Sequence, residues 1–142
     1  MKKSGITMVS IIMYVVIFFA LVAITTGTSM AMNSNALKDK GNIYVNEAEI
    51  KLKNNLLNSF NNSTSIEKIA NKIVFSNNDV YEYDSTNLIL YKNGGILLQN
   101  VIEFTFNNTN SAQDGVKTVT VQAKIKKYNQ EKIVDFFAQK GD

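Results

Sequence analysis

The sequence predicts an α+β fold in which one long N-terminal helix packs on an antiparallel β-sheet. Three observations support this prediction. An apolar stretch without charge precedes Lys38, the segment that follows repeats apolar residues at helical spacing, and the remainder alternates apolar and polar residues. We expect residues 6–32 to be a hydrophobic helix, 33–60 its amphipathic continuation, and 61–142 the sheet.

The composition limits the chemistry available to this chain of 142 residues. The chain has no cysteine, histidine, tryptophan or proline, and all fifteen of its basic residues are lysine. Disulfides, Ser–His and Cys–His nucleophile pairs and the usual zinc ligands are therefore excluded. We expect neither an enzyme nor a cofactor or metal site. The net charge of +3 is also too small for a general nucleic-acid binder, which needs a concentrated basic face.

A gap in the charge pattern is the strongest signal. No charged residue occurs between Lys3 and Lys38, and Ile11 to Ile24 is continuously apolar. A helix needs about 20 such residues to cross the hydrocarbon core of a bilayer. Lys2 and Lys3 place the N-terminus in the cytoplasm by the positive-inside rule, so the sheet region should be extracytoplasmic.

Three interpretations of this segment remain open. It could be a removable secretory signal with Ser29-Met30-Ala31 as the small-residue cleavage site, which would release a soluble domain. It could be a plain signal anchor. The third interpretation depends on the residues between the two lysines and the apolar run, where a generic signal has no need for Gly5.

The segment Lys2-Lys3-Ser4-Gly5-Ile6-Thr7 resembles the start of precursors in the type IV pilin superfamily, which includes pilins, pseudopilins and competence pilins. The resemblance implies that residues 1–5 are a leader, that prepilin peptidase cuts between Gly5 and Ile6, and that the new amine of Ile6 is methylated. It also implies that the helix is retained. The expected partners are membrane lipid before extraction, a membrane assembly platform, and other pilin or pseudopilin subunits.

Ser10 departs from the family pattern. The family has a glutamate at this position, which neutralises the N-terminal amine of a neighbouring subunit in the filament core. Serine cannot cancel a charge, and an unpaired charge in an apolar core costs several kcal/mol. We therefore expect a minor subunit near the filament tip, where no subunit above it presents an N-terminal amine that must be neutralised. The alternative is that Ser10 is only a small, helix-compatible residue in a divergent relative.

The helical pattern continues beyond the apolar stretch to about Asn58. Its apolar stripe is predicted to contain Leu37, Tyr44, Val45, Ala48, Leu52, Leu56 and Phe60. Gly27 and Gly41 are weak points in this helix, where it could bend or melt.

After residue 61 the pattern changes to that of strands. Thr64 and Glu67 could form a capping box for a short helix through Asn71. The predicted strands are 73–75, 80–83, 88–91, 96–98, 102–106, 118–126 and 133–138, with Asn93-Gly94-Gly95 as a hairpin turn. The segment around Val101 and Phe104 also resembles the J-type minor pseudopilins.

Two groups of charged residues are candidate sites. Asp79, Glu82 and Asp84 could ligate calcium, but they lack EF-hand spacing, so a solvated strand face is the expectation. Lys124, Lys126 and Lys127, with Lys117 nearby, could bind DNA or another anion. The expected role of these lysines is to discourage edge-to-edge strand pairing.

The sequence thus predicts a structural subunit, a minor pilin or pseudopilin of a type IV pilus-like filament or of a type II secretion or competence machine. It would be a single-pass membrane protein that reaches the cell surface on assembly and helps to initiate the filament tip. The alternative is a secreted or membrane-anchored binding module, such as an adhesin or a DNA-uptake subunit.

Overall fold

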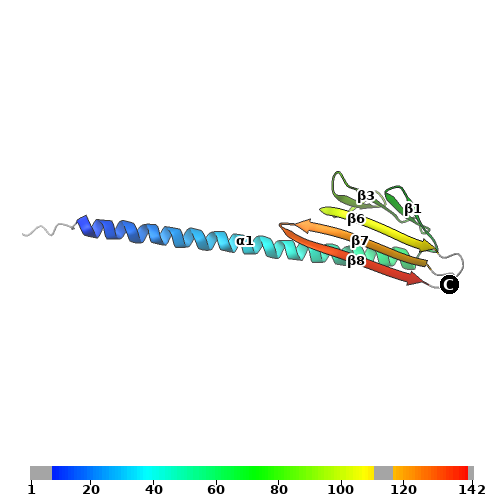
Figure 1. The fold of residues 1–142 in the computed structure, drawn as a ribbon, viewed down its shortest axis with the longest axis horizontal. Coiled ribbons are helices and arrows are strands. Elements are labelled where there is room, and N and C mark those ends of the chain that lie inside the picture. The colour runs from blue at the N-terminus through cyan, green and yellow to red at the C-terminus, as the bar shows by residue number, and fades with distance from the viewer. Residues whose placement is uncertain (1–7, 111–116, 141–142) are drawn as a thin grey trace, which may run out of the picture. The chain divides into compact units, whose positions relative to one another are not determined.

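The computed structural model describes residues 8–110 and 117–140. Across these residues, one helix is followed by eight strands (Figure 1). The helix α1 spans Met8–Asn61, and the expected end near residue 58 is therefore three residues short. The chain divides into two compact units, residues 1–37 and 38–142, so α1 contributes to both. The long N-terminal helix of the predicted α+β fold is confirmed.

The strands form two antiparallel sheets instead of the single sheet predicted. The five-stranded sheet has the order β1-β2-β3-β4-β5, and the three-stranded sheet has the order β6-β7-β8. Their bounds are β1 Ile66–Ile69, β2 Lys72–Phe75, β3 Val80–Asp84, β4 Ile89–Lys92, β5 Gly95–Gln99, β6 Val101–Asn110, β7 Lys117–Lys127 and β8 Gln130–Lys140.

Asn100 explains why the sheet divides. It lies between β5 and β6 with φ of 60°, a left-handed conformation that asparagine tolerates better than most residues. Its carbonyl accepts a hydrogen bond from the Lys126 amide at 3.0 Å, while the next amide, of Val101, donates to Leu88 at 3.0 Å. The chain therefore leaves the first sheet at Asn100 and begins the second.

The short helix predicted after Thr64 is wrong. Residues 66–69 form β1, which pairs with β2 so that Ile66 lies opposite Phe75. Both side chains are almost completely buried. A helix of this length is marginal in water, so burial of this cross-strand pair outweighs the local capping signal.

Two hairpin turns use left-handed residues as the sequence suggests. Asn93 and Gly94 have φ of 51° and 79°, as expected for a two-residue turn between β4 and β5. Tyr128 and Asn129 have φ of 48° and 62° between β7 and β8. The predicted strands 118–126 and 133–138 imply a longer connection, but β7 ends at Lys127 and β8 already begins at Gln130.

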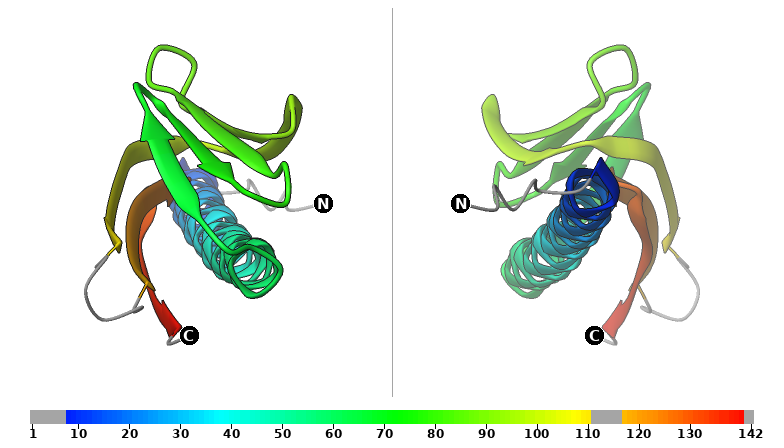
Figure 2. Two further views of the ribbon diagram at one scale, coloured as in Figure 1. Left: turned by 90° about the vertical axis from the view of Figure 1, so that its right-hand side faces the viewer. Right: turned by 90° about the vertical axis from the view of Figure 1, so that its left-hand side faces the viewer.

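The core of the C-terminal unit forms where the two sheets curve around the C-terminal part of α1 (Figure 2). The helix contributes the predicted stripe, except that Leu37 is 40% exposed and Tyr44 is only partly buried. Strand β7 matches the predicted strand 118–126, and its alternate apolar residues are buried. The buried residues that α1 and β7 contribute are Val45, Ala48, Leu52, Leu56, Phe60, Val119, Val121, Ala123 and Ile125.

Candidate functional site

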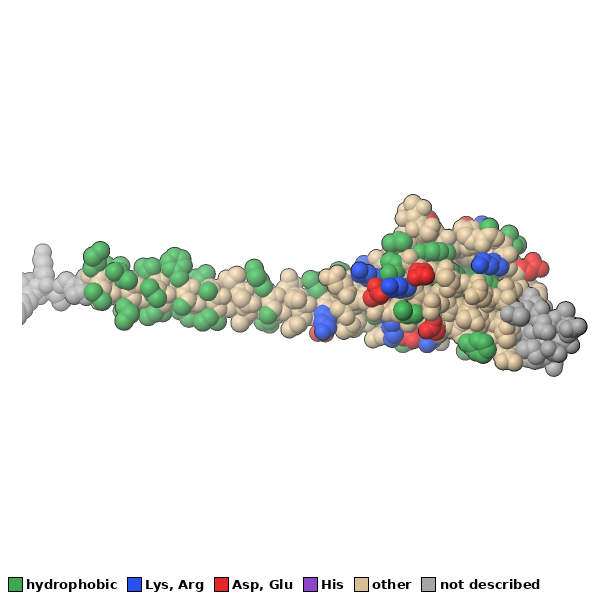
Figure 3. Space-filling model, in the orientation of Figure 1, with side chains coloured by type: hydrophobic (Ala, Val, Ile, Leu, Met, Phe, Trp, Pro, Cys, Tyr) green, Lys and Arg blue, Asp and Glu red, His purple; other side chains and the backbone are tan. Residues whose placement is uncertain are grey.

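The N-terminal unit presents a fully exposed apolar helix surface. Within the described residues, α1 is the one helix long and apolar enough to cross a membrane, with a mean hydropathy of 2.7 over its most apolar window and none of that window buried. Figure 3 shows hydrophobic side chains along this part of α1, with no charged side chain visible among them. A signal sequence would meet the same criteria. Such a surface requires lipid or protein around it.

The polar residues in this part of α1 are accommodated within the helix itself. The hydroxyl of Thr26 donates to the Val22 carbonyl at 2.8 Å, and Ser29 donates to the Thr25 carbonyl at 2.8 Å. Thr25 and Thr28 make equivalent bonds to carbonyls one turn earlier. Because these hydroxyls have partners inside the helix, they are compatible with an apolar environment.

The residues that carry the family resemblance are only partly within the described structure. Gly5 and Ile6, the predicted cleavage and methylation positions, lie outside the described residues. Ser10 lies near the start of α1, where its side chain is partly exposed between the exposed residues Val9 and Ile11. This position is compatible with an apolar surface, and the predicted role of Ser10 in assembly stays a prediction.

The three lysines proposed as an anion site do not form one patch. Lys124 lies 2.7 Å from the Glu131 carboxylate, and this hydrogen bond raises the pKa of Lys124. Lys127 instead lies over the rings of Tyr44 and Tyr128, at 5.4 and 5.2 Å from their centroids. Lys126 is exposed, and the side chain of Lys117 lies outside the described part of the structure.

The expected role of these lysines at a sheet edge is wrong. They lie on β7, which is the central strand of its sheet, between β6 and β8. On the register of that sheet, Lys124 lies opposite both Glu103 and Ile133, and Lys126 lies opposite Glu131. Lys124 and Lys126 therefore each have an acidic residue opposite them, and binding of DNA or another anion by these lysines stays a prediction.

The three carboxylates that are candidate calcium ligands each interact with different partners. Glu82 pairs with Lys72 at 3.1 Å, and Asp84 accepts hydrogen bonds from Thr86 and Asn87 in its own turn. Asp79 belongs to a partly buried polar network instead. Among the residues that the structure describes, no group of three potential metal ligands is present.

A polar network joins the C-terminal end of α1 to the five-stranded sheet. The Ser59 hydroxyl donates to the Asp79 carboxylate at 2.5 Å and lies 2.8 Å from the Tyr81 hydroxyl. The Lys92 ammonium lies 3.2 Å from Asp79 and 3.3 Å from the Ser59 hydroxyl, while Asn93 donates to Asp79 at 2.9 Å. No sequence motif indicates this network, because its members lie in α1, β3, β4 and the turns beside them.

The electrostatics of this network indicate a structural role. Burial alone would raise the pKa of Asp79, but hydrogen bonds from Ser59, Asn93 and Lys92 outweigh it and lower that pKa from 3.8 to about 2. Burial opposes the charge on Lys92, yet Asp79 and Tyr81 raise the pKa of Lys92 overall. A protonated lysine cannot act as a base, and Ser59 is completely buried, so the cluster does not make a nucleophile.

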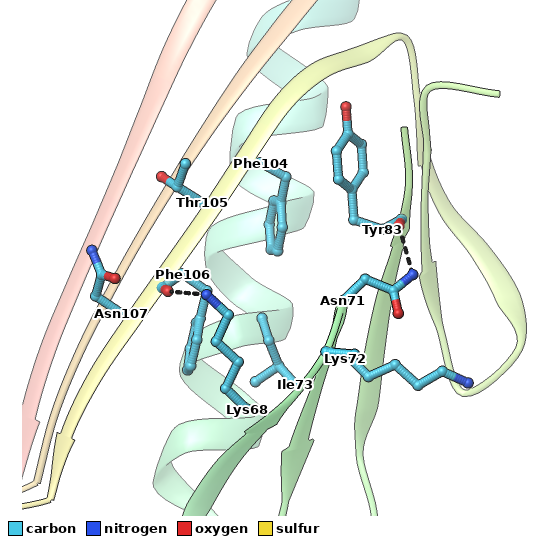
Figure 4. Close-up of a pocket in the computed structure, with 10 residues that line it drawn as sticks. Lys68, Asn71, Lys72, Ile73, Tyr83, Phe104, Thr105, Phe106 and Asn107 are labelled. Carbon is cyan, nitrogen blue, oxygen red and sulfur yellow. Dashed lines mark hydrogen bonds between the residues drawn. The ribbon is translucent and has the colours of Figure 1, made fainter. Parts of the chain in front are cut away.

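A cavity of about 340 Å³ opens where the two sheets diverge (Figure 4). Its base is formed by Ile73 and Phe106, which are buried, and one wall by the rings of Tyr83 and Phe104, whose centroids are 5.8 Å apart. The Tyr83 hydroxyl donates to the Val101 carbonyl at 2.9 Å. No local sequence pattern predicts this cavity, because its walls come from four strands of two sheets, β1, β2, β3 and β6.

Comparisons of the chain with protein-family models, with curated proteins and with solved structures found no match. Over residues 8–110 and 117–140, the fold and the apolar segment define an α+β protein with one candidate membrane-spanning helix.

Proposed function

We propose that this protein is a minor pilin or pseudopilin, a low-copy subunit of a type IV pilus-like filament or of a type II secretion or competence machine. It is held in the membrane by the first part of α1 until an assembly platform extracts it. The apolar helix then exchanges lipid for the helices of neighbouring subunits, and the sheet domain faces outward. Prepilin peptidase acts first, between Gly5 and Ile6.

The observation that carries this proposal is the two-part character of α1. One helix, Met8–Asn61, supplies both an uncharged, exposed apolar surface and the buried stripe that completes the core of the sheet unit. A secretory signal has no reason to be continuous with a core element of the exported domain. Loss of the helix before residue 32 would also require a cut inside α1, beside Ala31. Both features favour a helix that is retained.

The mature N-terminus tests the proposal directly. Intact-mass and N-terminal peptide mass spectrometry of the protein purified from its own host should find N-methylated Ile6. Gly5→Ala should leave the leader attached, whereas the matched control Gly27→Ala should be processed normally. A mature chain that begins at Met32, or one that keeps residues 1–5 in the wild type, would overturn the proposal.

The filament itself supplies a second readout. Mechanical shearing of whole cells should release the protein together with a much more abundant subunit, as expected for a minor component. Chemical cross-linking through single cysteines in the apolar part of α1 should join it to other subunits, since the wild-type chain has no cysteine to interfere. A protein that stays entirely in the membrane fraction of piliated cells would contradict assembly.

A further inference from the structure

The cavity between the two sheets lies beside the outer edges of two strands. β1 pairs with β2 and β6 pairs with β7, so each of β1 and β6 ends its sheet. Side chains bridge the two strands. Asn108 donates to the Ile66 carbonyl at 3.0 Å, and the Lys68 ammonium donates to the Phe106 carbonyl at 3.3 Å. Figure 4 shows Lys68 reaching across toward β6.

The bond from Lys68 reveals which backbone groups of β6 face the cavity. In an antiparallel pair, alternate residues direct their amide and carbonyl toward the partner strand, and the residues between them direct theirs away. Phe106 lies opposite Val121 on β7, yet its carbonyl is reached by Lys68 from the other side. The backbone groups of Phe106 therefore point away from β7, and so do those of Phe104, two residues earlier.

The cavity beside these groups combines an apolar base with positive charge. Its ten described lining residues include two lysines and no aspartate or glutamate. Lys72 points away from the cavity in Figure 4 and is paired with Glu82, whereas Lys68 lies along the cavity and donates to a neutral carbonyl. Lys68 is thus the cation that an incoming group would meet.

We propose that the cavity receives a short extended segment of a partner polypeptide, which adds to the outer edge of β6 at Phe104 and Phe106 and places an acidic side chain on Lys68. The partner's amide replaces Lys68 on the Phe106 carbonyl, which frees the ammonium for the carboxylate. An apolar side chain of the segment packs against the wall formed by the rings of Tyr83 and Phe104. Strand addition of this kind takes its affinity from main-chain hydrogen bonds and its specificity from side-chain pockets. This inference does not depend on the proposed filament.

The test uses the full chain in lipid nanodiscs and a short, blocked, fluorescein-labelled peptide of alternating valine and threonine with one central glutamate. Fluorescence anisotropy should show saturable binding, with empty nanodiscs as the background. Replacing the central glutamate with lysine should abolish saturation. Lys68→Gln should weaken binding by about threefold, as expected for an exposed ion pair, while Lys126→Gln on the other face of the sheet should leave it unchanged.

Two backbone-methylated versions of the peptide separate strand addition from simple contact. N-methylation of one alternate set of amides should weaken binding about tenfold, because those amides face β6. N-methylation of the other set should change it by less than about twofold, since those amides face away. Neither version alters the protein, so no folding defect can imitate the result.

Several outcomes would overturn the inference. They are the absence of saturation up to about 1 mM peptide, equal binding of the lysine peptide, equal losses from both methylated peptides, and an unchanged affinity in Lys68→Gln. Competition by blocked glutamate alone, as strong as by the whole peptide, would identify a small-anion site and also overturn strand addition.

Discussion

Gly41 on α1 lies so close to Gln130 on β8 that no side chain fits between them. A β-carbon at Gly41 would come 2.7 Å from Cγ of Gln130 and 2.8 Å from the carbonyl oxygen of Lys127. Both distances are shorter than van der Waals contact allows, and the second involves backbone. Gly41 is also buried. The residue that weakens the helix locally therefore permits α1 to approach the turn between β7 and β8.

Gly41→Ala should destabilise the sheet unit. Alanine gains about 1 kcal/mol of helix propensity, but the backbone around Lys127 must shift, and overpacking typically costs about 1–3 kcal/mol. We expect a net loss of about 1 kcal/mol or more in the free energy of unfolding. Urea denaturation of the full chain in detergent micelles, followed by tyrosine fluorescence, measures it.

Gly27→Ala is the matched control for this prediction. Among the described residues, nothing beyond the adjoining helix backbone lies within 4 Å of a β-carbon placed at Gly27, so alanine there should leave the unfolding of the sheet unit unchanged. A Gly41→Ala protein as stable as the wild type would show that the close approach is not required.

Regular periodicity made part of this fold predictable. Val45, Ala48, Leu52 and Leu56 recur at helical spacing because one face of α1 is buried, and the alternation from Val119 to Ile125 follows from one buried face of β7. α1 is helical through both Gly27 and Gly41, so neither predicted weak point breaks it. The need for glycine at position 41 depends on Gln130, which is distant in sequence, and the local pattern could not show it.

The remaining features depend on partners far apart in the chain. The division into two sheets rests on the left-handed Asn100, one asparagine among many in this sequence. In the network, Ser59 belongs to α1, Asp79 to the loop that precedes β3, and Lys92 to β4. No periodic pattern marks such residues, because each contributes a single polar group. The cavity beside β6 could not be predicted either, because its lining residues come from strands that are far apart in the sequence.

Asp79→Asn should reduce stability at neutral pH and flatten its acid dependence. The folded pKa of Asp79 is about 2, below its ordinary value of 3.8, so its ionisation stabilises the fold above pH 3.8. That contribution, about 2 kcal/mol, should be lost as the pH falls from 3.8 toward 2. The variant should therefore be less stable than the wild type at pH 7 and nearly equal to it at pH 2.

The measurement for Asp79 is urea denaturation at several pH values between 2 and 7. Asp135→Asn provides the control, because it also removes one carboxylate but from an exposed position on β8, where Asp135 accepts a bond from Gln122. Parallel pH profiles for Asp79→Asn and the wild type would refute the assignment of this acid dependence to Asp79.

Ser10→Glu tests whether the proposed tip position depends on the residue near the start of α1. A glutamate there introduces a carboxylate into an apolar helix surface, at a cost of several kcal/mol unless a neighbouring amine neutralises it. In the proposed filament, a neighbouring amine would neutralise this carboxylate only in a subunit that docks beneath another. We therefore expect Ser10→Glu to lower the frequency of assembly or to move the protein away from the tip, as measured by counting filaments and by immunogold labelling along their length.

Ser10→Gln, which has a similar size without the charge, should behave like the wild type, and extraction at alkaline pH should show that both variants still enter the membrane. Unaltered assembly frequency and location in Ser10→Glu would mean that Ser10 is only a small, helix-compatible residue.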